Sequence, residues 1–209
     1  MFFLEKLNKY ECFENNIWVP CTQNEICQDE ENTIFRAIKN DTLYLDNWVE
    51  KLDLICEPHY RIGYIGSAFF AGLLVGLTFI PTISDKYGRR PVFNGCLIAS
   101  VVFMLGLSFS NNLDFTLFCL VAMGVQWSCR FVVGLSYIDE LIPPHHKENL
   151  IFSNFLFSAS TNFLIPFIFW AFTTNWWCIN IFGLIQIAFS ILIVPWYVPE
   201  SPKFYYENN

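Results

Sequence analysis

The sequence predicts an all-α membrane protein with about five transmembrane helices, preceded by a small disulfide-bearing extracellular loop region. Hydrophobic residues make up 54% of the chain and charged residues only 15%, whereas soluble domains carry about 25% charged residues. Residues 62–83 form a run of 22 and residues 92–109 a run of 18 without a charged side chain. Each run is close to the ~20 residues that a helix needs to cross ~30 Å of hydrocarbon. Both runs therefore indicate membrane spans.

The front segment, residues 1–61, is polar and acidic and is expected to lie outside the cell. It holds twelve Asp or Glu residues against six Lys or Arg, while the rest of the chain holds seven and six. Asn40 begins an Asn-Asp-Thr glycosylation sequon. Four cysteines in such a segment indicate an oxidising environment and two disulfides, in one of three connectivities. The candidate cysteines are Cys12, Cys21, Cys27 and Cys56.

Several function classes find no support in the sequence. Because no C-x2-C pair is present, we expect no zinc or other metal site. No Walker loop or nucleophile elbow occurs, so we expect neither an enzyme nor a cofactor. No basic groove with interleaved aromatic residues is apparent, which makes nucleic acid an unsuitable partner. The four cysteines within apolar runs are interpreted as small core residues: Cys96, Cys119, Cys129 and Cys178.

A charged octapeptide at residues 84–91, Ser-Asp-Lys-Tyr-Gly-Arg-Arg-Pro, separates the first two spans. So tight a connection leaves both helix ends on the same side of the bilayer. Its basic residues mark that side as cytoplasmic by the positive-inside rule. Gly88 permits a close turn, and Asp85, Arg89 and Arg90 supply charges that can pair with other cytoplasmic groups.

The third predicted span, residues 115–137, contains Arg130, the one charge at membrane depth. Gln126 and Arg130 recur at helical spacing and share a polar stripe. A charge at this depth costs at least ~2.5 kcal/mol, so it is expected to face a cavity or a partner. The alternative is an arginine that snorkels to the headgroups or pairs with a neighbouring helix. The sequence leaves both interpretations open.

The fourth and fifth predicted spans are residues 149–172 and 178–197, and a cytoplasmic tail at residues 199–209 follows them. Asn154 and Ser158 share one side of the fourth span, which either lines a water-filled path or hydrogen-bonds another helix. Gln186 is the strongly polar side chain deep within the fifth span. The transmembrane bundle as a whole is therefore predicted at residues 62–198.

Three motifs in these connections resemble those of the major facilitator superfamily. Residues 85–90 resemble the D-R-x-G-R-R loop, although Pro81 stands where the family has glycine. Residues 137–147 are similar to the Y-x-x-E-x-x-P-x-x-x-R stretch and include Glu140. Residues 199–203 resemble P-E-S-P-R and include Glu200. The resemblance spans residues 46–203 and is nearest to the organic cation and anion transporters, with sugar porters as the neighbouring branch.

The resemblance implies the N-terminal half of a facilitator-type carrier, with one helix expected before Met1 and a second bundle after Asn209. Such carriers move small organic solutes, organic ions or sugars, by alternating access. The implied gating residues are Asp85, Gly88, Arg89, Arg90, Glu140 and Glu200. In this interpretation, Arg89 and Arg90 form forked pairs with Glu140 or Glu200, and Asp85 bonds the free amides of a facing helix start. Helical faces, independently of the resemblance, give the candidate substrate-pathway residues: Gln126, Arg130, Asn154, Ser158 and Gln186.

Two interpretations of function remain open. The first is a multi-pass carrier of the plasma membrane whose partners are the lipid bilayer, a small organic solute and a C-terminal half. The alternative is a non-transporting, membrane-embedded interaction or regulatory protein that packs against a full-length relative. The charge of the substrate is also open, because the acidic front segment would enrich cations whereas Arg130 would suit anions.

Overall fold

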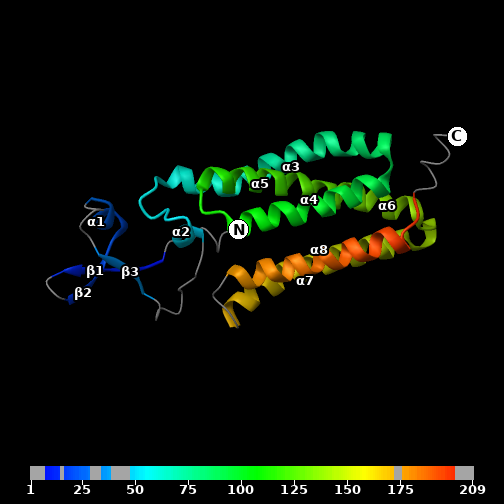
Figure 1. The fold of residues 1–209 in the computed structure, drawn as a ribbon. Coiled ribbons are helices and arrows are strands. Elements are labelled where there is room, and N and C mark those ends of the chain that lie inside the picture. The colour runs from blue at the N-terminus through cyan, green and yellow to red at the C-terminus, as the bar shows by residue number, and fades with distance from the viewer. Residues whose placement is uncertain (1–7, 15–16, 29–33, 39–47, 172–175, 201–209) are drawn as a thin grey trace.

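The fold is a helical membrane bundle with a small disulfide-bonded cap at one end (Figure 1). The computed structural model describes residues 8–14, 17–28, 34–38, 48–171 and 176–200. The cap contains β1 (Tyr10–Glu14), β2 (Ile17–Cys21), α1 (Gln23–Gln28), β3 (Phe35–Ala37) and α2 (Trp48–Lys51). The bundle contains α3 (His59–Tyr87), α4 (Arg89–Phe109), α5 (Leu113–Ser128), η1 (Cys129–Val133), α6 (Gly134–Leu141), α7 (Pro144–Ala171) and α8 (Trp176–Tyr197).

The cap adds a three-stranded antiparallel sheet, ordered β2-β1-β3, to the predicted all-α architecture. Along β1 the side chains alternate, with Tyr10 and Cys12 buried and Phe13 exposed, as a strand with one covered face requires. The two disulfides join Cys12 to Cys21 and Cys27 to Cys56. The prediction of two bridges is therefore confirmed, and the structure selects one of the three connectivities. Asn40 lies outside the described residues.

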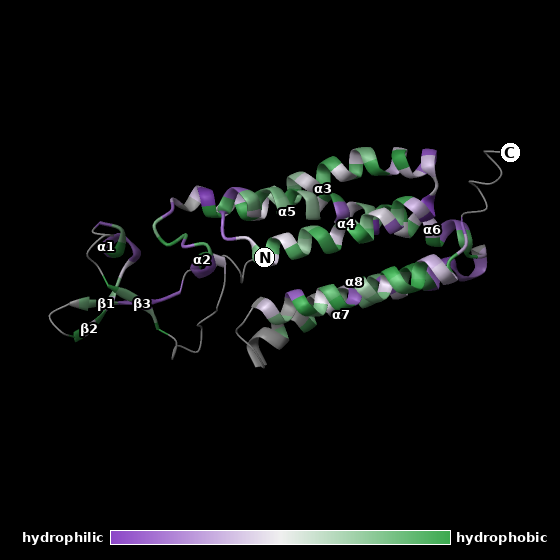
Figure 2. Cartoon of the chain, in the orientation of Figure 1, coloured by the Kyte–Doolittle hydropathy of each residue, from purple (hydrophilic) through white to green (hydrophobic). Residues whose placement is uncertain are grey.

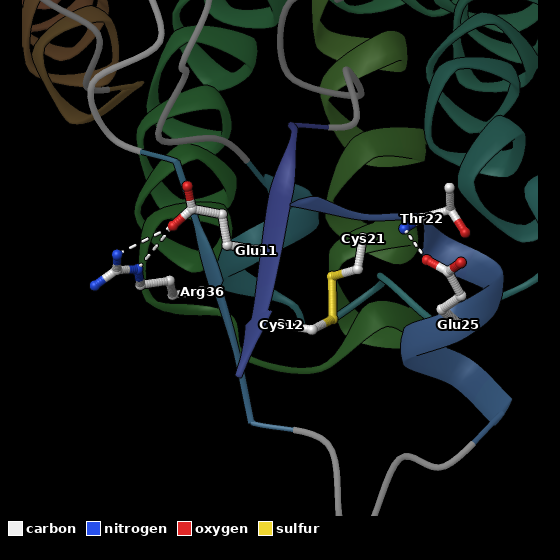
Figure 3. Close-up of a disulfide and its surroundings, with 6 residues drawn as sticks. All are labelled: Glu11, Cys12, Cys21, Thr22, Glu25 and Arg36. Carbon is white, nitrogen blue, oxygen red and sulfur yellow. Dashed lines mark hydrogen bonds and ion pairs between the residues drawn. A yellow bond between two sulfur atoms is a disulfide. The ribbon is translucent and has the colours of Figure 1, made fainter. Parts of the chain in front are cut away.

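Local polar contacts fix the segments beside the first disulfide (Figure 3). The backbone amide of Thr22 donates to Glu25 Oε2 at 2.6 Å, which is one half of a capping box at the start of α1. This hydrogen bond lowers the pKa of Glu25 below its ordinary value. On the neighbouring strands, Arg36 donates to Glu11 from Nε at 3.2 Å and from Nη2 at 3.0 Å. The cap therefore has its own hydrogen-bonded framework in addition to the covalent bridges.

The cap and the bundle share one hydrophobic core. Ile26 and Val49 of the cap belong to the same cluster of buried side chains as Ile65 of α3 and Leu120 of α5. Lys51 Nζ donates to the carbonyl oxygens of Leu107 at 3.2 Å and Ser108 at 2.8 Å, which lie in the last turn of α4. Burial lowers the pKa of this amine from its usual value. The cap is thus packed onto the bundle and also satisfies carbonyl groups at the end of one of its helices.

Among the described residues, four helical stretches are long and apolar enough to cross a membrane, and hydrophobic residues, green in Figure 2, recur along the helices of the bundle. They are Tyr60–Tyr87, Arg89–Phe109, Leu113–Leu141 and Asn180–Tyr197. Helix α7 lies where the fourth span was predicted, although residue 172 at the end of that prediction is outside the described residues. The described helices confirm the predicted fold class.

The helices extend beyond the apolar runs from which they were predicted. Residues 84–91 were expected to form a charged loop, but α3 ends at Tyr87 and α4 begins at Arg89, which leaves only Gly88 between them. Gly88 has φ 98°, a backbone angle that glycine adopts without strain. A hydropathy boundary marks where the chain leaves the lipid, whereas a helix continues for as long as its backbone hydrogen bonds are made. Helix α3 also runs on past Pro81.

The tightest packing in the bundle lies between α3 and α5, at a contact that we call the glycine seam and define by Gly72, Gly76 and Gly124. A Cβ atom on Gly72 would lie 1.9 Å from the carbonyl oxygen of Val121. A Cβ on Gly124 would lie 2.1 Å from the carbonyl oxygen of Phe69, and one on Gly76 would lie 2.0 Å from Ser128 Oγ. The backbones of the two helices therefore touch, as small residues allow where membrane helices pack closely.

Candidate functional site

The end of the bundle opposite the cap carries a group of charged side chains, which we call the charged cluster: Asp85, Arg89, Glu140 and Glu200. The Arg89 guanidinium is 12% exposed and lies at its centre. Its Nη2 atom is 2.8 Å from Asp85 Oδ1 and 3.0 Å from Glu140 Oε1, while Nη1 donates to Ser84 Oγ at 3.1 Å. The pairing of Arg89 with Glu140 therefore joins the α3–α4 connection to α6.

Glu200 binds the start of α4. Its Oε1 atom accepts from the backbone amides of Arg89 at 3.0 Å and Arg90 at 3.1 Å, the first two residues of α4. The sequence led us to expect this capping of a helix start from Asp85, and to expect Glu140 or Glu200 to pair with Arg89 or Arg90. Asp85 instead pairs with Arg89 one turn further along the chain. The free amides and positive dipole end of α4 explain why a carboxylate binds there.

Other contacts hold the segment after α8 against the same end of the bundle. The Arg90 guanidinium donates to the carbonyl oxygen of Pro195, and the Tyr137 hydroxyl donates to the carbonyl oxygen of Pro199. A Cβ atom on Gly88 would approach Glu200 Oε2 to 3.3 Å. The expected pairing of Arg90 with a carboxylate is not found in the described residues. Its place is taken by a hydrogen bond to the backbone near the end of α8.

A cavity of about 360 Å³ lies between the third span and the helices α7 and α8. Its walls are mostly apolar and aromatic, and its polar side chains come from two different spans. Thirteen residues line it: Phe93, Trp127, Arg130, Phe131, Gly134, Leu135, Tyr137, Ile138, Leu141, Asn154, Ser158, Val194 and Val198. Of these, only Arg130 carries a charge at neutral pH. This size and this composition are typical of a small-molecule site.

Arg130 lies in η1, a π-helical turn that interrupts the third span. Such turns occur mostly as single insertions in α-helices and are frequent at functional sites. The guanidinium carbon lies 5.4 Å from the ring centroid of Trp127, within the range of a cation–π contact. Arg130 Nε is buried and has no hydrogen-bond partner among the described residues. The turn therefore holds a cation at the wall of the cavity.

The cavity collects three of the five predicted pathway residues: Arg130, Asn154 and Ser158. Gln126 is not among the lining residues, although its Oε1 atom is buried without a hydrogen-bond partner in the described structure. Gln186 also does not line the cavity, and its side chain is exposed on α8. Helical spacing alone could not establish which side of α8 faces the third span, and this explains why Gln186 does not join the group.

Some residues of this region were not predicted from the sequence. Asn94 Oδ1 on α4 is a further buried atom without a hydrogen-bond partner in the described part of the chain, and its polar side chain in an apolar run was the available signal. Trp127 lies three residues before Arg130, a spacing that brings side chains together on a helix. Cys96, Cys119 and Cys129 are buried, and Cys129 Sγ lies 4.0 Å from the carbonyl oxygen of Val92, as expected for core residues. Cys178 is exposed, so the core interpretation was wrong at that position.

The fold and the site together define a multi-pass helical membrane protein, with a charged cluster at one end and a polar cavity between its spans. The family model for the sugar (and other) transporters matches residues 13–209. The chain therefore belongs to the sugar (and other) transporter family, in agreement with the resemblance that its motifs carry.

Proteins with transporter names and a vesicle protein are among those similar to this chain. An organic cation transporter-like protein of Drosophila melanogaster is 24% identical over 176 residues, covering 84% of this chain and 30% of that protein. The organic cation/carnitine transporter 2 of Homo sapiens is 26% identical over 168 residues, covering 77% and 29%. The synaptic vesicle glycoprotein 2C of Homo sapiens is 25% identical over 167 residues, covering 73% and 23%. The chain thus spans less than a third of the length of these relatives.

Proposed function

We propose that the chain forms part of a facilitator-type carrier that moves small organic solutes across a membrane by alternating access. The observation that carries the proposal is the cavity beside η1, with Arg130 from the third span and Asn154 from α7 in its walls. A carrier needs a solute site between two groups of helices that can move relative to each other. Membership of a transporter family supports the same function.

In this proposal the charged cluster acts as a latch at the cytoplasmic end. Arg89 connects the α3–α4 hairpin with Glu140, and Glu200 connects the end of α8 with the start of α4. These are contacts between charges and helix ends, which can exchange partners without disturbing a packed core. Release of one pair would free α8 or α6 to move. Gly88 keeps the connection short enough for Glu200 to reach both amides.

The orientation of the chain is a further part of the proposal. The cap carries two disulfides, which persist in oxidising compartments, and the opposite end carries Lys86, Arg89 and Arg90, which favour the cytoplasm. We place the cap outside the cell, with the protein in the plasma membrane. If Asn40 is glycosylated there, treatment with a glycosidase should increase the mobility of the wild-type chain and leave an Asn40→Gln variant unchanged.

We further propose that the chain works with a second membrane bundle, either the C-terminal half of a carrier or a full-length relative. The short span of the chain relative to known transporters supports this part of the proposal. Its other partners are the lipid bilayer and the solute.

Uptake into phosphatidylcholine vesicles that contain the purified chain tests the proposed function. The panel contains tetraethylammonium, carnitine, an aromatic carboxylate and glucose, each compared with protein-free vesicles. We expect uptake of at least one organic ion, with altered uptake in an Arg89→Gln variant and unaltered uptake in Arg61→Gln, where the arginine belongs to an exposed pair with Glu57. Uptake of the whole panel at the protein-free rate would contradict transport by the chain on its own, and the same result after reconstitution together with the second bundle would contradict the carrier function.

A further inference from the structure

The cavity beside η1 holds one charge for which the described structure provides no counter-ion. Arg130 makes no ion pair with any described residue, and its Nε atom is buried without a partner. The carboxylates of the charged cluster already have partners, because Arg89 pairs with Asp85 and Glu140 and the start of α4 binds Glu200. An isolated charge in an apolar environment is costly unless a charged or polar group of opposite sign meets it. A ligand that supplies this group would recover much of that cost.

The surroundings of Arg130 favour one chemical class of ligand. Trp127, Phe131 and Phe93 present aromatic surface, and no Asp or Glu is among the lining residues. A guanidinium offers two parallel donors that match a carboxylate, and it would repel an ammonium group. Asn154 and Ser158 on α7 add polar side chains across the cavity. The walls therefore suit an anion at one point and an apolar or aromatic body over the rest.

We infer that Arg130 binds the carboxylate of a soluble organic anion whose aromatic or apolar body lies against Trp127 and Phe131. This inference rests on the proposed function, because the site is the proposed solute pathway, and it adds the charge that the pathway prefers. A volume of about 360 Å³ lies at the lower end of the ~300–1,000 Å³ that is usual for ligand sites, which indicates a small molecule with a single ring. The relatives named for organic cations would differ from this chain in that preference.

Three probes of the same shape but different charge test the inference: 3-phenylpropionate, 3-phenylpropylamine and 3-phenylpropanol. Their binding to the purified chain in phosphatidylcholine nanodiscs is measured by equilibrium dialysis at pH 7.5, where the first is an anion and the second a cation. We expect the anion to bind at least about tenfold more tightly than the alcohol, because a charge-assisted hydrogen bond is stronger than a neutral one. The amine should bind more weakly than the alcohol.

Two variants of Arg130 and one control separate a ligand contact from a packing role. Arg130→Gln should weaken binding of the anion about tenfold or more and leave binding of the alcohol unchanged. Arg130→Lys should keep part of the preference for the anion, since the charge remains. Arg61→Gln, at an exposed arginine of the same membrane protein, should change neither. Binding of the alcohol by Arg130→Gln also shows that this variant is folded.

The outcomes distinguish this inference from the proposed function. If the wild-type chain binds the alcohol or the amine as tightly as the anion, the preference for carboxylates is wrong while a solute site remains. If none of the three probes binds, both the inference and the solute site fail. Should a few mole per cent of phosphatidylserine in the nanodisc abolish binding of the anion, Arg130 pairs with a lipid headgroup, and the soluble-anion inference is overturned.

Discussion

The glycine seam and helix α7 differ in how closely they pack against the rest of the bundle. At the seam, α3 and α5 approach so closely that a single added methyl group on Gly124 would collide with a backbone carbonyl. Along α7, by contrast, residues 152–160 are all exposed, and one of its contacts with the third span is a ring contact between Phe155 and Phe131, with centroids 6.2 Å apart. The comparison teaches that the seam is a rigid unit, whereas α7 is attached to it through long side chains around a cavity.

The charged cluster lies where these two regions meet. Arg89 joins helix ends on the side of the seam, because α4 follows α3 directly after Gly88 and α6 follows α5 through η1. Glu200 instead links the segment after α8 to the start of α4. A latch of this kind restrains the looser helices at one end and leaves the seam untouched. The following predictions test this division, from the largest expected effect to the smallest.

Gly124→Leu should have the largest effect, because the side chain must displace the backbone of α3 at Phe69. We expect the destabilisation to reach about 3 kcal/mol or more, at the upper end of what overpacking costs. Thermal unfolding in detergent, followed by tryptophan fluorescence, measures it. Gly63→Leu is the matched control, since nothing lies within 4 Å of a Cβ at that position. Equal midpoints of thermal unfolding for the two variants would show that close packing at the seam does not stabilise the bundle.

Arg89→Gln should have the second-largest effect, because it withdraws a nearly buried guanidinium from Asp85 and Glu140 together. Loss of a charged partner in such a position costs about 2–3 kcal/mol. The same unfolding measurement applies. Arg89→Lys should recover less than half of the loss, because an ammonium group cannot reproduce the forked geometry of a guanidinium. Full recovery by lysine would show that charge alone matters at this position.

Glu200→Gln should cost about 1 kcal/mol, the usual value of a cap at a helix start. Because Glu200 ties the segment after α8 to the start of α4, its loss should be accompanied by faster proteolysis after Tyr197. Cleavage in the disulfide-bonded cap at the other end should be unchanged. Glu57→Gln provides the comparison, since its pair with Arg61 is exposed and such pairs contribute little. Faster cleavage throughout the chain would indicate a global effect in place of a local tie.

Phe157→Ala on α7 should have the smallest effect. Its side chain is 69% exposed, and substitutions at exposed positions usually stay within about 0.5 kcal/mol. The midpoint of thermal unfolding should therefore remain near that of the wild type. A loss comparable to that of Gly124→Leu would mean that α7 is packed as tightly as the seam.

Much of this fold could be predicted from the sequence, because its strongest signals are long apolar runs and paired cysteines. The three motif-bearing connections also predicted which charges would gather at one end, and Arg89 and Glu140 do meet. The sheet of the cap was not predicted, since strands of three to five residues in a polar segment carry a weak periodic signal. The exchange of roles between Asp85 and Glu200 was not predictable either. It depends on whether a free helix start or a guanidinium lies nearer to each carboxylate, which only the packing of α8 against α4 decides.

The candidate site, too, could be predicted from the sequence only in part. Arg130 was recognisable because a charge at membrane depth is rare and costly, and Asn154 and Ser158 followed from their shared side of a helix. The π-helical turn that holds Arg130, and the aromatic walls supplied by Trp127 and Phe93, depend on how three spans pack together. Sequence spacing does not contain that information.

Distances between nitroxide labels test the division between a rigid seam and a loosely attached helix most directly. Labels are placed at exposed positions, Ile83 on α3 paired either with Phe118 on α5 or with Phe163 on α7, in a background with Cys178→Ser. Pulsed electron resonance in nanodiscs should give a narrow distance distribution for the pair across the seam and a broad one for the pair that includes α7. Equally narrow distributions for both pairs would contradict the account.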